Sequence, residues 1–317
     1  MSQHLNYSAP MIASEEVRKN FIKSFILVAF VAAAVFGASW YLGKLLGDVK
    51  VGIFIGLVIV AIVLPLQILT SKWMILGMSR GRPVNPNDLR ERRLLHIAEG
   101  LAVSAGLRKV PEIYIVPTDV PNAFASGMSE DSAFIGVTEG LLDMMDNQEL
   151  EGVLAHEFGH IIHRDIMLNS LVIGLISSLL VIVVIIERLG FMELIYGGRR
   201  RSRDRDSGGG AAVIVIMLIV LLIRPLAMLF GALLQSAISR QREYAADAVA
   251  VRLCNYNEGL ASALEKLSGD RQYSDQDIES LGSKQLASMY IHFPDANELF
   301  STHPPINDRV KRLRNMY

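Results

Sequence analysis

Four long hydrophobic runs constrain the fold of this chain more than any other feature of its sequence. They cover residues 24–42, 51–69, 166–186 and 211–234. A helix needs about 20 apolar residues to cross the hydrocarbon core of a membrane, and each run is close to that length. Hydrophobic residues make up 51% of the 317 residues, and the mean hydropathy is +0.34. We therefore expect a mainly α-helical membrane protein with about four transmembrane helices.

The first two runs are expected to form a transmembrane hairpin, because only residues 43–50 separate them. The first run is not typical of a signal peptide, since a polar segment that includes Glu15 precedes it and its apolar part is too long. Whether the third and fourth runs both span fully is open. Asn169 dilutes the third run, and Arg224 in the fourth is either a functional buried charge or a charge packed against other helices.

A short motif has the spacing of a metal site. His156, Glu157 and His160 form an H-E-x-x-H pattern. No proline follows the expected N-cap, Asn147, so we expect a helix that continues into the third hydrophobic run. Residues four apart share a helix face, so both imidazoles can reach one Zn²⁺, while Glu157 can take a proton from water. The alternative is a buried helix in which two histidines are only hydrogen-bonded.

A catalytic zinc site needs a third protein ligand, and Glu243 is the candidate. It lies in an alanine-rich stretch that we expect to be helical. Asp247 is one turn further on and can orient a ligand histidine. Arg240 or Arg242 can hold the carboxylates in place. The alternative for this stretch is an ordinary salt-bridged helix that binds no metal. His163 could compete as a ligand, or it could instead make a polar contact.

The two motifs, in this order and with hydrophobic runs between them, resemble the M48 family of membrane zinc metallopeptidases, and within it the HtpX-type proteases. The resemblance covers nearly the whole chain. It implies an α+β, zincin-like (gluzincin) catalytic domain with a small β-sheet. It also implies that His156, His160 and Glu243 bind one Zn²⁺. Glu157 is then the general base, and Asp247 supports a ligand histidine.

A further segment fits the resemblance. Asn122, Ala123 and Phe124 lie between two strand-like pieces, residues 112–116 and 132–138. In similar proteins this segment is the edge strand over the active site, where an extended peptide can pair with it. Asn122 would then hold the substrate backbone. Without the resemblance, a turn-forming Pro-Asn before a buried strand is an equally good interpretation.

The resemblance gives roles to two residues late in the sequence. His303 would contact the tetrahedral intermediate and donate to the developing oxyanion, an interaction that lowers a reaction barrier strongly. Its spacing alone would make it a loop residue. Arg309 is expected to pair with an acidic group near Glu243 or Asp247.

These expectations divide the chain into four parts. Residues 1–71 hold the N-terminal segment and the transmembrane hairpin. Residues 72–165 form the first part of the catalytic domain, with the H-E-x-x-H helix. Residues 166–235 hold the third and fourth hydrophobic helices with an Arg-rich loop. Residues 236–317 form the second part of the catalytic domain, with the third zinc ligand.

The resemblance also implies a location and substrates. The active site would face the cytoplasm from the cell (inner or plasma) membrane, and the enzyme would cut damaged or misfolded membrane proteins as part of quality control. The distribution of basic residues barely discriminates between the two orientations. Membrane lipid and unfolded chains are the expected partners, and the oligomeric state is open. The formal net charge of -1 gives no case for nucleic acid, and no GxxxxGK[ST] pattern encodes an ATP site.

Two other functions fit the sequence less well. A non-catalytic membrane scaffold with a zinc site would not need Glu157 beside its ligands. A metal transporter would place ligands inside the hydrophobic runs, and these contain no histidine. The single cysteine, Cys254, excludes an intrachain disulfide framework and is expected to be a small packed side chain.

Overall fold

The computed structural model describes residues 47–168, 170–171, 240–269 and 304–316, together with single residues between 18 and 44. The chain divides into two compact units. The first comprises Met1–Ile26, Ser71–Leu171 and Ser236–Tyr317, and the second comprises Leu27–Thr70 and Val172–Gln235.

Helices make up the described part of the second unit. The described residues from 28 to 44 are helical, and α2 (Val49–Val58) follows after a short turn. A π-helical segment, η1 (Ile59–Val63), comes directly after α2, and α3 (Leu64–Ser79) comes directly after η1. Residues 64–70 of α3 belong to this unit, and residues 71–79 belong to the first unit. The second predicted run, residues 51–69, therefore lies in consecutive helical segments.

A capped turn and close backbone packing hold the start of α2. Asp48 is its N-cap, and the carboxylate accepts hydrogen bonds from the backbone N–H of Lys50 at 2.9 Å and of Val51 at 3.3 Å. A Cβ atom at Gly52 would lie 2.4 Å from the backbone oxygen of Ser39 and 2.7 Å from the Cα of Gly43. Only glycine allows so close an approach of two backbones.

No helix among the described residues is both long enough and apolar enough to cross a membrane. The four predicted spans are therefore not confirmed. The fourth run and the Arg-rich loop lie outside the described residues, as does the third run beyond its first few residues.

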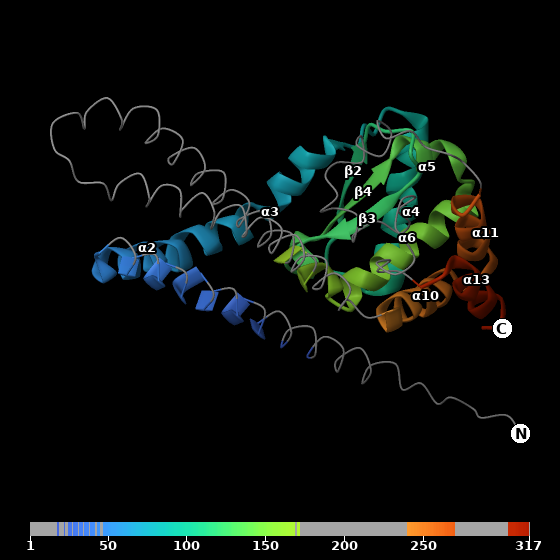
Figure 1. Cartoon of the computed structure of the whole chain (residues 1–317). Helices are drawn as coiled ribbons and strands as arrows, with labels where there is room; N and C mark the ends of the chain where they lie inside the picture. The colour runs from blue at the N-terminus through green and yellow to red at the C-terminus, as the bar shows by residue number, and fades with distance from the viewer. Residues whose placement is uncertain are drawn as a thin grey trace, which may run out of the picture. The chain divides into compact units, whose positions relative to one another are not determined.

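The first unit contains a small mixed sheet, as predicted. Its strands are β1 (Arg82–Pro83), β2 (Glu112–Val116), β3 (Ala123–Ser126) and β4 (Phe134–Thr138), in the order β1-β2-β4-β3. β2 and β4 are parallel, whereas β1 pairs with β2 and β3 pairs with β4 in the antiparallel direction. The sheet thus ends at β3 among the described strands, so this strand presents a free edge (Figure 1).

Helix α6 (Asn147–Ile162) lies at the centre of this unit and packs against β3 and three other helices. The prediction of Asn147 as its N-cap is wrong by one residue. Asp146 is the cap, because its carboxylate accepts from the backbone N–H of Gln148 and Glu149, both at 2.9 Å. Glu149 returns the contact by accepting from the N–H of Asp146 at 2.9 Å. This reciprocal pair is a capping box.

The helix does not continue unbroken into the third hydrophobic run, contrary to the prediction. It ends at Ile162, and His163 and Arg164 form a turn in which Arg164 has φ 56°. A left-handed backbone interrupts an α-helix. The chain becomes helical again at Asp165, so that the break changes the direction in which this side chain points.

The remaining helices of the first unit surround α6. They are α4 (Leu89–Ala105), α5 (Glu139–Met144), α10 (Arg240–Cys254), α11 (Glu258–Leu267) and α13 (Ile306–Arg314). Helices α10, α11 and α4 contact α6, and α13 contacts α10 and α11 (Figure 1). Residues from α4, α6, α10, α11, α13 and the strands share one buried hydrophobic cluster. Segments on both sides of the long undescribed stretch therefore build a single core.

Candidate active site

Three side chains from two helices converge in the interior of the first unit. His156 and His160 lie one turn apart on α6, and Glu243 comes from the first turn of α10. The two histidine Nε2 atoms are 3.2 Å apart. The glutamate oxygens lie 3.6 Å from the Nε2 of His156 and 3.5 Å from that of His160. Within the described part of the chain, these residues form the group that can hold a metal ion.

These distances fit a tetrahedral zinc ion. Ligand atoms about 2.0–2.1 Å from such an ion lie roughly 3.3 Å from one another. The separation of 3.2 Å between the two Nε2 atoms is close to that value, as are those of 3.5 Å from His160 to Oε1 of Glu243 and 3.6 Å from His156 to Oε2. Two imidazoles and one carboxylate are also a donor set that zinc enzymes use. His163 is buried but does not belong to this group.

A close contact between the two helices brings the ligands together. A Cβ atom at Gly159, inside the H-E-x-x-H motif, would lie 2.9 Å from the Cα of Ala246 on α10. Contacts below 3.0 Å are essentially never seen for real Cβ atoms. The missing side chain at Gly159 therefore lets α10 approach until Glu243 reaches the histidines.

The second ring nitrogen of His156 has a fixed partner. Its Nδ1 lies 2.9 Å from Oδ1 of Asp247, and Arg309 donates to both oxygens of that carboxylate at 2.7 and 3.0 Å. Burial and Arg309 oppose protonation of His156, but hydrogen bonds to Asp247 and Glu243 outweigh them and raise its pKa to about 9. The Nδ1 contact with Asp247 orients the ring so that Nε2 faces His160 and Glu243, where a bound metal ion would take the place of the Nε2 proton.

His160 has a corresponding partner that the sequence did not reveal. Its Nδ1 lies 3.1 Å from Oδ2 of Asp165, and Nη1 of Arg242 lies 3.3 Å from Oδ1 of the same carboxylate. Burial alone would raise the pKa of Asp165, but the hydrogen bond and charge of His160, together with Arg242, lower it. Asp165 therefore stays ionised although it is buried. The break after α6 is what turns it toward His160, and neither proline nor glycine signals that break.

Glu157 lies between the two histidines in sequence and is 2% exposed. Its pKa is raised, first by burial, although the nearby histidines and a backbone hydrogen bond from Ala125 oppose that shift. Ala125 belongs to β3, so the carboxylate lies next to the free edge of the sheet.

The register of β3 shows which backbone groups face that edge. The N–H of Thr138 donates to the carbonyl of Asn122 at 3.0 Å, and Ala123 is opposite Val137. Because hydrogen-bonded pairs alternate along an antiparallel ladder, the backbone groups of Ala123 and Ala125 point away from β4. The Asn122 side chain is fully buried, and its Oδ1 accepts from the N–H of Ala123 at 3.0 Å. Phe124 packs edge-on against Phe134.

Of the two late residues with predicted roles, Arg309 is described by the structure and His303 is not. Arg309 is completely buried, and besides Asp247 its Nη1 lies 3.5 Å from Oε2 of Glu243. His303 lies outside the described residues.

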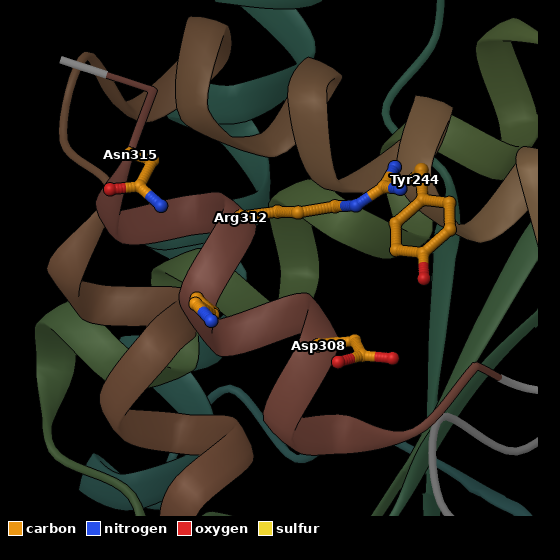
Figure 2. A pocket seen from close by; sticks show the side chains of 5 residues that line it. Tyr244, Asp308, Arg312 and Asn315 are labelled. Atoms are coloured by element: carbon orange, nitrogen blue, oxygen red, sulfur yellow. The ribbon is translucent and has the colours of Figure 1, made fainter.

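A separate hollow lies on the outer surface of α10 and α13 (Figure 2). Tyr244, Asp308, Lys311, Arg312 and Asn315 line it, and its volume is about 360 Å³. The Arg312 guanidinium stacks over the Tyr244 ring at 3.8 Å from its centroid. None of the predicted site residues lines this hollow.

Comparisons with known proteins agree with the geometry of the buried site. Residues 88–317 match the family model described as Peptidase family M48. A protein described as "Protease HtpX homolog" from Streptococcus uberis is 36% identical over 310 residues, which cover 95% of this chain and 99% of that protein. Another of that description, from Listeria innocua, is 37% identical over 294 residues, covering 92% and 93%. A third, from Tropheryma whipplei, is 36% identical over 304 residues, covering 95% and 97%.

Proposed function

Since this chain belongs to peptidase family M48 and is therefore a zinc metallopeptidase, we propose that His156, His160 and Glu243 bind the zinc ion and that Glu157 is the general base. The observation that carries this assignment is the convergence of three ligand atoms, all within 4.8 Å of one another, although Glu243 is 83 positions after His160 in the sequence. Bound there, zinc would act as a Lewis acid that polarises a peptide carbonyl and makes water more acidic.

Glu157 is suited to move a proton at this site. Because it follows the first ligand on the same helix, its carboxylate lies beside the metal position rather than on it. It would accept a proton from the attacking water and return it to the leaving amine. Asp247 and Arg309 would hold His156 in one tautomer during the reaction. We assign His303 to stabilisation of the oxyanion, an assignment that rests on the resemblance to this family.

The free edge of β3 would align the substrate. The carbonyl groups of Ala123 and Ala125 face outward and can accept hydrogen bonds from an extended peptide, which supports this role. Their N–H groups already donate to Asn122 and to Glu157. The carboxylate of Glu157 lies next to Ala125, so a peptide bound there would have its scissile bond near the base. Asn122 and Phe124 flank these groups and would shape the same strand.

We further propose that the enzyme acts at the cell membrane on damaged or misfolded membrane proteins, from the cytoplasmic side. Apolar side chains exposed along residues 49–79 support insertion of this segment. They are Val51 (50%), Phe54 (67%), Leu57 (53%), Ile62 (58%), Leu66 (56%) and Leu69 (78%). Lys50 and Lys72 bracket them at roughly 33 Å along a helix, close to the hydrocarbon thickness of a bilayer. Trp73, beside Lys72, is 70% exposed and of the type found at membrane interfaces.

The catalytic assignment is tested with Glu157→Gln in the detergent-purified chain. We expect one zinc per chain in the wild type and in the variant, and a loss of casein cleavage of at least a hundredfold in the variant, in line with removal of a general base. Zinc content and cleavage are measured on the same samples.

The matched control is Glu151→Gln, the same change on the same helix but outside the ligand group. This variant should cleave at the wild-type rate. If Glu157→Gln cleaves casein at the wild-type rate, another group is the base. A wild type that binds zinc but cuts no unfolded or membrane substrate would favour a non-catalytic scaffold.

A further inference from the structure

Asp165 and Arg242 occupy positions around His160 that parallel those of Asp247 and Arg309 around His156. In both cases a buried carboxylate lies at the Nδ1 of a histidine, and a buried arginine lies at that carboxylate. The exposed fractions of the Asp165 and Arg242 side chains are 2% and 6%. Burying a charged side chain costs free energy unless a nearby opposite charge compensates it.

The contact also joins two parts of the fold. Asp165 lies just after the turn that ends α6, whereas Arg242 is on α10, directly before the ligand Glu243. The Nε and Nη2 atoms of Arg242 have no hydrogen-bond acceptor among the described residues. Among the described residues, the contact with Asp165 is therefore the one that compensates the buried charge of the Arg242 guanidinium.

We propose that Asp165 and Arg242 are positioning residues that fix His160 for metal binding. Asp165 holds the proton of His160 on Nδ1, so that the lone pair of Nε2 faces the zinc position. Arg242 holds Asp165 in place through the contact between its Nη1 and Oδ1 of the carboxylate. Because Arg242 is adjacent to Glu243, the same contact joins the start of α10 to the segment that follows α6.

This inference rests on the proposed metal ligands, and its test must separate the two. The full-length protein is purified in detergent as the wild type, Asp165→Ala, Asp165→Asn, Arg242→Gln and Arg242→Lys. Zinc affinity is measured by competition with a chromophoric chelator. The visible spectrum of the cobalt-substituted protein reports the geometry of the ligands, and thermal unfolding of the metal-free form reports folding.

We expect Asp165→Ala to weaken zinc binding by about 10- to 100-fold, the usual effect of removing a partner of a ligand histidine. Its cobalt spectrum should also change. Asp165→Asn, which keeps the size and a hydrogen-bond acceptor, should lose less affinity. Arg242→Gln should weaken binding in the same direction, and Arg242→Lys should restore part of it. The double variant Asp165→Ala with Arg242→Gln should bind no more weakly than Asp165→Ala alone, since the two residues act through one contact.

The matched control is Glu91→Gln. Glu91 is also a buried carboxylate, 3% exposed, and its Oε1 lies 2.7 Å from Nη2 of an arginine, Arg82, but it has no contact with the ligand group. Its zinc affinity should equal that of the wild type. An Asp165→Ala protein that folds and binds zinc with wild-type affinity and an unchanged cobalt spectrum would overturn the inference. If Asp165→Ala does not fold, the two single variants Asp165→Asn and Arg242→Gln replace it. Wild-type zinc affinity and an unchanged cobalt spectrum in both of them would overturn the inference. A wild type without bound zinc would instead refute the proposed ligands.

Discussion

Cys254, the one thiol of the chain, is partly buried at the end of α10, and its Sγ lies 3.8 Å from the carbonyl oxygen of Glu151. Burial, and then the charge of Glu151, raise the pKa of this thiol to about 12. Because only the thiolate reacts with disulfide reagents, we predict that Cys254 reacts at pH 8 on the order of a thousandfold more slowly in the native protein than in the denatured chain. The absorbance of released thionitrobenzoate measures both rates, and similar rates would show that the thiol is accessible and ionised in the fold.

The partners of the two histidines show how far spacing along the sequence predicts which residues are neighbours. Asp247 lies at i+4 from Glu243, and the structure places it 2.9 Å from His156. Asp165 was missed because it lies five residues after His160, a spacing that does not share a face of a continuous helix. Only the turn with its left-handed Arg164 makes the contact possible. Backbone reversals of this kind are set by tertiary packing rather than by local residue type.

At the scale of elements, the crossing of α6 and α10 determines the metal site. We predict that Gly159→Ala lowers the free energy of unfolding by about 1–3 kcal/mol, the usual cost of overpacking a core, because the added methyl would lie 2.9 Å from the Cα of Ala246. The displaced α10 should carry Glu243 away from the histidines, so zinc affinity should fall as well. Denaturant titration of the metal-free protein and chelator competition measure the two effects.

The control for this substitution is Gly100→Ala on α4. Gly100 is exposed, and a Cβ atom there would meet nothing within 4 Å. The same change should therefore stabilise the protein by about 0.5–1 kcal/mol, because alanine has the higher helix propensity. A Gly159→Ala protein as stable as the Gly100→Ala protein would show that the two helices can separate without cost.

The boundaries of elements were predicted less well than their existence. The helix with the zinc motif exists, but its cap is Asp146, because an aspartate with Glu149 three residues later forms the stronger capping pair. The strand expected over residues 132–138 begins at Phe134, since Glu130–Ser132 form a short 3₁₀ turn. Several neighbouring polar residues can each form the cap or the turn, and the sequence alone does not show which of them does so.

At the scale of the whole molecule, we predict that the chain behaves as an integral membrane protein. Membranes from cells that express it are extracted with alkaline carbonate, which releases proteins held by charge or by peripheral contacts. The chain should stay in the pellet and should be released by detergent, because the exposed apolar residues of 49–79 would otherwise face water. A peripheral membrane protein in the same sample is the control, and release of this chain together with it would contradict membrane insertion.

The family could be recognised from sequence because two ligand motifs lie in the right order across nearly the whole chain, and the comparisons confirm it. The division into four parts, the spans and the orientation stay predictions. Hydropathy reports only that a segment prefers an apolar environment, and it does not report which neighbouring helix or lipid supplies that environment.

The order of the ligands along the chain has a consequence for the timing of biosynthesis. Glu243 is 83 positions after His160, and Arg309 is 66 positions after Glu243. A ribosome that adds about 5–20 residues per second makes the two histidines roughly 4 to 17 seconds before the glutamate. During that interval the nascent chain holds only two of the three proposed metal ligands. With the proposed ligand set, zinc-dependent cleavage therefore becomes possible only after residues 166–234, which hold the third and fourth hydrophobic runs, have been made.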